Sequence, residues 1–472
     1  MATDEKGSGF VGHLSPNQEV KLQQLWMIIL KASDTQKLSM ASSATVTDSQ
    51  DLAHQDLAHQ DLAHQDRRHS SLSSIKSDPS GKTSNLSSKT SILSSSTNCS
   101  HLTEAFQKMD ISASDMKSTE EVLSGMAPGQ LRMGFLSAIQ NENPDTFLLR
   151  FLRARKWDVI KAFTMMAGAI EWRMKEMNVD QLMAEGELQA LKLSQNASNA
   201  SDKKTGHDFL AQMRMGKSFI HGVDTTGRPI CVVRVRLHRP GEQSEETLER
   251  YIVHFIESVR LMLVAPAETA TVIFDLTGFS LSNMEYAPVK FIINCFEANY
   301  PECLGVLLIH KAPWVFSGIW RLIKGWLDPV IASKIYFTNN AADLEKFISR
   351  ERIVKELGGN DEWTYKYSEP SLDENDIMND TATRDVLLTE RQKLADDLLL
   401  ATSAWIAATT AKDDAEIAIY KEQRAANIKR LHSNYWQLDP YLRARTVLDR
   451  TGALKDHRCH SSEESLANIR EA

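Results

Sequence analysis

The pattern of apolar and polar positions predicts that strands and helices alternate in the central part of the chain. Short apolar runs rich in β-branched residues occupy residues 229–237, 269–276, 305–310 and 334–337. Helix-length segments lie between them, among them residues 245–264 and 286–299. Strands that alternate with helices are typical of an α/β domain with a largely parallel sheet. We therefore predict an α/β lobe that spans residues 206–370.

Helical patterns precede this lobe. Residues 15–18, SPNQ, read as a capping box with proline at the first helical position, and an apolar stripe follows them. Residues 1–31 are therefore expected to supply one helix. Residues 134–205 are expected to form a helical lobe, with a short helix over 181–193 and a polar linker over 194–205.

Two further segments have a different character. Residues 32–133 are rich in Ser, Thr, Asp and Gln and contain three copies of DLAHQ. Such a segment buries too little apolar surface to offset its chain entropy, so we expect it to be disordered. Residues 371–472 begin as an acidic linker and become a helical tail. An apolar stripe on this tail docks either on the rest of the chain or on a partner: Leu387, Leu394, Leu398 and Trp405.

An unusually apolar stretch, PWVFSGIWRLIKGWL, covers residues 313–327. From residue 316 to 327 the apolar side chains recur at helical spacing, and Asp328-Pro329 then ends the pattern, which predicts a short amphipathic helix. Three interpretations stay open from the pattern alone: a core helix, a membrane-surface anchor, or a movable lid over an apolar cavity. The residues that would form its apolar face are Trp314, Phe316, Ile319, Trp320, Ile323, Trp326 and Leu327.

Composition narrows the possible function classes. A net charge of −8 does not favour nucleic-acid binding, and five scattered cysteines without a CxxC pair predict neither a disulfide framework nor a zinc site. The chain begins without a signal-peptide core and has no uncharged apolar run of about 18 residues, so we expect it to be cytoplasmic. It also lacks the common hydrolase, metalloprotease and nucleotide-binding motifs. We predict a non-enzymatic protein without metal or cofactor; the alternative is a haem or metal bound by His221 or His310.

Several stretches resemble successive motifs of one family. LLRFLRARKWDVIKA, followed by EWR, is similar to the helical N-terminal module of the CRAL-TRIO lipid-binding family. DTTGRPI, FDLTGFS, FEANYPECLG and WLDPVIASKIYF resemble motifs of its lipid-binding lobe, in the same order, and the fungal phosphatidylinositol transfer proteins are the most similar branch. The resemblance covers about residues 140–370. It implies a helical lobe packed on an α/β lobe, a sheet that floors a deep apolar pocket, and a mobile gate helix at the apolar stretch.

The resemblance also implies a binding site for the phosphate of an inositol lipid. Arg155 and Glu302 match an Arg and a Glu that hold this headgroup in family members, and Lys156 lies beside Arg155. Lys334 matches a Lys that follows the gate, whereas a Thr of the same site is replaced by Ile331, which removes one hydrogen bond. We therefore expect phosphatidylinositol as a ligand.

At a second site the sequence departs from the family. Members that also carry phosphatidylcholine place two Tyr, one Ser and one Thr around its phosphate, and here these positions are Ile220, Cys231, Ala270 and Val272. Because an unpaired buried charge is costly, we expect phosphatidylcholine to bind poorly and a sterol or other neutral lipid to take its place. The expected activity is lipid transfer by a protein that touches membranes transiently. The alternative is a lipid-sensing scaffold that recruits unknown protein partners.

Overall fold

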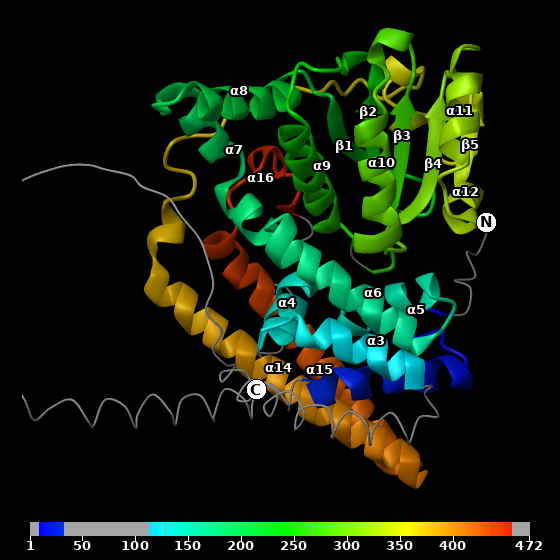
Figure 1. Ribbon diagram of the computed structural model, residues 1–472, viewed down its shortest axis with the longest axis vertical. Helices are drawn as coiled ribbons and strands as arrows, with labels where there is room; N and C mark the ends of the chain where they lie inside the picture. Colours follow the sequence, from blue (N-terminus) through cyan, green and yellow to red (C-terminus); the bar gives the residue numbers. More distant parts are fainter. Residues whose placement is uncertain (1–8, 33–112, 128, 264, 456–472) are drawn as a thin grey trace, which may run out of the picture.

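The computed structural model describes residues 9–32, 113–127, 129–263 and 265–455. They form a lobe built around a β-sheet, drawn at the upper right of Figure 1, and a second lobe made of helices, which fills the lower half and extends to the upper left. This architecture confirms the predicted fold class: an α/β lobe, a helical lobe and a helical C-terminal region. Of the segment expected to be disordered, residues 33–112 lie outside the described residues.

In the described part of the chain, the sheet has five strands in the order β1-β2-β3-β4-β5. β1 runs antiparallel to β2, and the other neighbouring strands are parallel. The strands are β1 (Ser218–Val223), β2 (Pro229–Arg234), β3 (Ala270–Asp275), β4 (Leu304–His310) and β5 (Ile335–Thr338). β2 to β5 correspond to the predicted apolar runs. The pattern does not predict β1, because a His and a Gly interrupt the apolar run of this edge strand.

The two faces of the sheet have different neighbours, because successive side chains of a strand point to opposite sides. Ile230 and Val232 pack against segment 344–357, whereas Cys231 and Val272 face α9 and the helical segment that contains α10. Figure 1 shows α9 and α10 in front of the sheet, with α11 at its far edge beside β5. The helices of this lobe are α9 (Glu245–Arg260), α10 (Tyr286–Asn294) with its π-helical extension Cys295–Asn299, α11 (Phe316–Lys324), α12 (Pro329–Ser333) and α13 (Ala341–Leu344).

The helical lobe begins with a helix over residues 16–32. Its capping box is present: Ser15 N donates to Gln18 Oε1 (2.9 Å) and Gln18 N donates to Ser15 Oγ (3.3 Å). The following helices are α3 (Ala113–Ser124), α4 (Gln130–Ile139), α5 (Pro144–Ala154), α6 (Val159–Glu171), the π-helix Trp172–Glu176, α7 (Val179–Asn196) and α8 (Ala200–Arg214).

Two local predictions for this lobe are wrong. Residues 113–124 are helical although they belong to the segment expected to be disordered, because Val122 and Leu123 pack on the core of the lobe. The polar linker expected over 194–205 is largely helical, since Asn199 caps α8 and its later turns bury apolar side chains against α7 and α9.

The C-terminal helices α14 (Thr381–Ala411) and α15 (Asp414–Leu442) form a hairpin along the helical lobe (Figure 1). Its apolar stripe is buried in the core of that lobe at Leu394, Leu398 and Trp405, while Leu387 is half-buried. Arg424 of α15 donates to both carboxylate oxygens of Asp145 (2.7 and 3.0 Å), and Trp26 Nε1 donates to the same carboxylate at 2.7 Å. Of the two alternatives for the stripe, docking within the chain is therefore the one observed.

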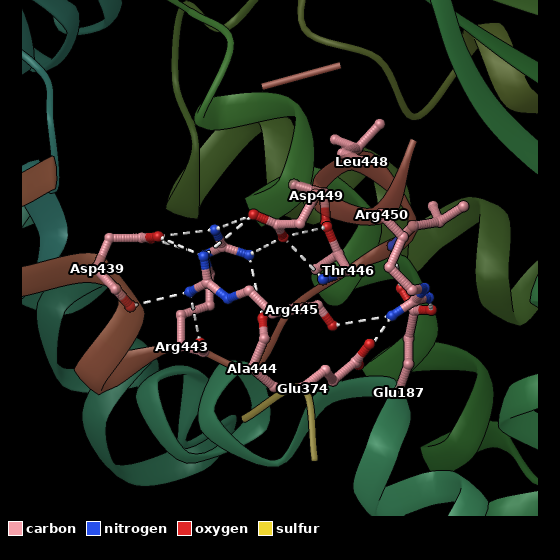
Figure 2. A network of polar contacts seen from close by, with 12 residues as sticks. Glu187, Glu374, Asp439, Arg443, Ala444, Arg445, Thr446, Leu448, Asp449 and Arg450 are labelled. Atoms are coloured by element: carbon pink, nitrogen blue, oxygen red, sulfur yellow. Dashed lines mark hydrogen bonds and ion pairs between the residues drawn. The ribbon is translucent and has the colours of Figure 1, made fainter. Parts of the chain in front are cut away.

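Residues 439–450, here named the C-terminal clasp, are held by buried ion pairs (Figure 2). The carboxylates of Asp439 and Asp449 both accept hydrogen bonds from Arg443 and Arg445, at distances of 2.7 to 3.1 Å. Asp449 belongs to the short helix α16 (Val447–Arg450). The alternation of opposite charges allows four ionised groups, two of them buried and two half-buried, to lie together.

The clasp is also tied to α7. Arg450 pairs with Glu187 of α7 and with Glu374 (3.0 Å), as Figure 2 shows. Ala444 N donates to Met183 O at 2.9 Å. At Gly186, where φ is +53°, an added Cβ would lie 2.6 Å from the Cβ of Ala444. Glycine thus permits the close approach of the clasp to α7.

Candidate functional site

A cavity of about 250 Å³ lies between the sheet, α9, α10 and α11. Cys231, Ala270 and Val272 of the sheet line it, as do Trp320 and Ile323 of α11. Well-packed cores contain few voids larger than a water molecule, so this space is not ordinary packing. The region beneath the predicted gate helix is hollow.

The helix α11 turns its apolar face toward this cavity. Phe316, Ile319 and Ile323 are buried, while Arg321 and Lys324 lie on the exposed side. The helix ends at Lys324 rather than at residue 327 as predicted, because Gly325 closes its last turn. Leu327 follows the helix and still lines the cavity.

Exposed apolar side chains surround the outer side of this region. Trp314, directly before α11, is 89 % exposed, and Trp326 contacts Tyr286 edge-on, with the ammonium of Lys290 4.9 Å from its ring centre. Other exposed apolar residues in this part of the chain are Leu322, Val330, Tyr336 and Phe337. None of the helices in the described ranges has the length and apolar character needed to cross a bilayer.

The helix α10 forms another wall of the cavity. Its sequence, YAPVKFIIN, is strongly apolar, yet none of its residues is buried. Val289, Ile292 and Ile293 line the cavity. In a filled core these side chains would lose their accessible surface, so the cavity explains how an apolar helix stays accessible.

The four positions expected at the second ligand do not all meet at the cavity. Cys231, Ala270 and Val272 are on its wall. Ile220 is instead packed between the cluster of Cys231 and a cluster that includes Tyr435 of α15. Burial raises the pKa of the Cys231 thiol to about 12, so this group stays neutral. These positions offer no charge or hydroxyl to a polar headgroup.

The residues expected to hold a headgroup are only partly brought together. Lys334 Nζ lies 3.1 Å from Glu302 Oε2 in a half-buried ion pair. Arg155 and Lys156 follow the end of α5, and among the described residues the side chain of Arg155 donates only to the adjacent carbonyl of Ala154 (3.4 Å). Glu302 and Lys156 both have positive φ, of 56° and 52°. Such strain in non-glycine residues concentrates at functional sites.

Two arginines of α5 connect this helix to loops that precede the strands: Arg150 contacts the Glu302 and Glu268 segments, and Arg153 contacts Glu268. Arg150 is buried and donates to the carbonyls of Glu302 (2.7 Å) and Glu268 (2.6 Å). Arg153 lies 4.0 Å from the Glu268 carboxylate. The resemblance assigned Arg155 and Lys156 to a phosphate site, whereas the structural role of Arg150 was not predicted. The sequence contained one indication of this role: Arg150 and Arg153 are three positions apart, so they lie on the same side of an otherwise apolar helix.

Comparisons with known proteins agree with this architecture. The family model described as CRAL/TRIO domain matches residues 213–359, and the one described as CRAL/TRIO, N-terminal domain matches residues 102–168. "CRAL-TRIO domain-containing protein C3H8.02" of Schizosaccharomyces pombe is 40% identical over 76% of this chain and 77% of its own length. "Phosphatidylinositol transfer protein CSR1" of Eremothecium gossypii is 44% identical over 71% of this chain and 74% of its own. "SEC14 cytosolic factor" of Kluyveromyces lactis is 29% identical over 46% and 71%. With its sheet, its helical lobe and these relatives, the chain belongs to the CRAL-TRIO family.

Proposed function

We propose that this protein binds phosphatidylinositol and a neutral or sterol-like lipid, and that it transfers or presents these lipids between membranes. The observation that carries the proposal is the apolar cavity of about 250 Å³ beneath an amphipathic helix. A relative of similar length that is named as a phosphatidylinositol transfer protein supports it. Relative to water, a lipid chain in such a cavity is stabilised by roughly 0.8 kcal/mol per buried methylene.

The headgroup of phosphatidylinositol is proposed to bind at Glu302 and Lys334, near Arg155 and Lys156. In the structure the carboxylate of Glu302 balances the charge of Lys334 at 3.1 Å. A lipid phosphate can replace this carboxylate as the partner of the ammonium, and Glu302 can then accept hydrogen bonds from inositol hydroxyls. A phosphate that leaves water needs such cationic donors.

Entry of the lipid is proposed to require movement of α11 into a membrane. The cavity is lined on this side by Phe316, Trp320 and Ile323 of α11. Displacing the helix would therefore open the cavity. Trp314 and Leu322 are already exposed, and Arg321 and Lys324 are placed to reach lipid headgroups. This combination of aromatic, aliphatic and basic side chains is typical of a helix that lies in a membrane interface.

Transfer from mixed vesicles tests the proposal. The wild-type protein should extract phosphatidylinositol in preference to phosphatidylcholine, because Cys231, Ala270 and Val272 supply no partner for a buried phosphocholine. Lys334→Ala should lower phosphatidylinositol transfer about tenfold or more, since a hydrogen bond to a charged group contributes about 1.5–3 kcal/mol. Lys346→Ala is the matched control, because Lys346 also pairs with a carboxylate, that of Asp343 at 3.0 Å.

Two results would contradict the proposal. One is transfer of phosphatidylcholine and phosphatidylinositol at equal rates by the wild type. The other is an equal effect of Lys334→Ala and Lys346→Ala. Mass spectrometry of lipids that co-purify with the wild type identifies the second ligand independently.

A further inference from the structure

A polar cluster closes one end of the apolar cavity. It consists of Lys217, which precedes β1, His238, which follows the 3-10 turn after β2, and Glu285, which lies directly before α10. Lys217 Nζ lies 3.1 Å from His238 Nδ1, and His238 Nε2 lies 2.9 Å from Glu285 Oε2. All three side chains line the cavity.

This cluster is remote from the proposed phosphatidylinositol site. Ser218 pairs with Val233, so Lys217 lies beside the carboxyl end of β2. Glu302 and Lys334 instead precede β4 and β5, at the amino ends of the parallel strands. Glu302 and Lys334 are not among the residues that line the cavity, whereas Lys217, His238 and Glu285 are, so the cluster and the proposed phosphatidylinositol site are separate.

The charges of the cluster are balanced. Burial lowers the pKa of Lys217 to about 8, against the opposing effect of Glu242 and Glu285, so the ammonium is still mostly protonated at neutral pH. Burial and the nearby Lys217 lower the pKa of His238, which keeps the imidazole neutral. Lys217 then donates to His238 Nδ1, and His238 Nε2–H donates to the carboxylate of Glu285. The carboxylates of Glu285 and of the nearby Glu242 offset the ammonium of Lys217, so the cluster carries no excess positive charge.

The ammonium of Lys217 can form more hydrogen bonds than it makes to the described residues. Within the described residues it makes one hydrogen bond, to His238, although an ammonium carries three N–H groups. Other cations on the cavity wall are paired with carboxylates: Arg234 with Glu356 and Arg260 with Glu257. Lys217 is 5 % exposed, so water from outside has little access to its remaining donors. A buried donor of this kind favours an acceptor in the cavity.

We propose that Lys217, His238 and Glu285 bind the hydroxyl group of an uncharged lipid alcohol whose apolar body fills the cavity. A hydroxyl oxygen accepts from Lys217, and its proton can be donated to Glu285. A hydroxyl group leaves the net charge of the cluster unchanged. A carboxylate or phosphate would instead add an uncompensated negative charge beside Glu285. The inference rests on the proposed lipid-binding function and gives the chemical class of its second ligand.

Three lipids with the same chain and different ends test this inference: hexadecanol, hexadecane and hexadecanoate. Each is offered to the full-length protein in vesicles, in competition with a fluorescent hydrocarbon-chain lipid. We expect the wild type to prefer hexadecanol. In Lys217→Met, which keeps the length of the side chain and removes its charge, the ratio of hexadecanol to hexadecane affinity should fall about tenfold or more. Glu285→Gln should lower the same ratio, and the exposed Lys192→Met should leave it unchanged.

The outcomes separate this inference from the proposed function. Binding of hexadecane and hexadecanol with the same affinity ratio in the wild type and Lys217→Met overturns the hydroxyl site but leaves the lipid cavity intact. A preference for hexadecanoate overturns the assignment to an uncharged ligand. If the wild type binds phosphatidylinositol and none of the three lipids, the second ligand is not a lipid alcohol. If it binds no lipid at all, both proposals fail.

Discussion

Replacing Trp314 by alanine is expected to weaken membrane binding without destabilising the fold. The side chain lies directly before α11 and is 89 % exposed, so its removal creates no cavity. Surface substitutions of this kind usually change the free energy of unfolding by less than about 0.5 kcal/mol. Any loss of membrane binding is then a direct effect of the missing indole.

The size of the effect follows from the exposed surface. A tryptophan contributes up to about 250 Å² of contact area, so 89 % exposure leaves roughly 220 Å² available to a bilayer. If about half of this area enters the interface, burial at about 25 cal/mol per Å² stabilises the bound state by about 2.7 kcal/mol. The retained methyl group and incomplete insertion reduce this value, so we expect binding that is roughly ten- to a hundredfold weaker.

Flotation with vesicles of phosphatidylcholine and phosphatidylinositol measures the partition coefficient directly. Leu400→Ala is the matched control, because Leu400 is a 73 % exposed apolar residue on α14, which Figure 1 places on the helical lobe, away from α11. Thermal unfolding of both variants checks that the fold is unchanged. Two results would refute the proposal that the side with Trp314 and α11 contacts the membrane. One is unaltered vesicle binding by Trp314→Ala, and the other is an equal loss of vesicle binding in Leu400→Ala.

Two further predictions concern stability. Burial, and then the nearby guanidinium of Arg443, lower the pKa of His254 to about 3, so between about pH 6.5 and pH 3 the unfolded state binds a proton that the folded state does not. The free energy of unfolding should therefore decrease as the pH falls through this window, by up to about 1.4 kcal/mol per pH unit, and denaturant titrations of His254→Gln should show a correspondingly smaller slope. In the C-terminal clasp, Asp439→Asn leaves buried guanidinium groups without a full counter-charge and should destabilise the protein by about 3–5 kcal/mol in urea unfolding. The same change at the exposed Asp373 is the control, and an equal small effect at both positions would show that the clasp contributes little.

The local sequence pattern determined much of the fold. Apolar runs with β-branched residues predicted β2 to β5, because a strand buried on both faces needs apolar side chains throughout. The helical spacing of Phe316, Ile319 and Ile323 likewise predicted a one-sided helix at the place where the structure has α11. The pattern did not decide whether that helix covers a cavity, since a core helix has the same spacing.

The tertiary structure decided which distant residues meet. Lys217, His238 and Glu285 are separated by 21 and 47 positions, and each lies in an ordinary polar stretch. They become a cluster only because β1 pairs antiparallel with β2 and α10 begins beside the same end of the sheet. Likewise, the docking of α14 and α15 on the helical lobe requires a complementary apolar surface on another segment. Periodicity shows which face of an element is apolar, but contacts between elements depend on chain topology. The cavity and its polar cluster could therefore be found only in the folded structure.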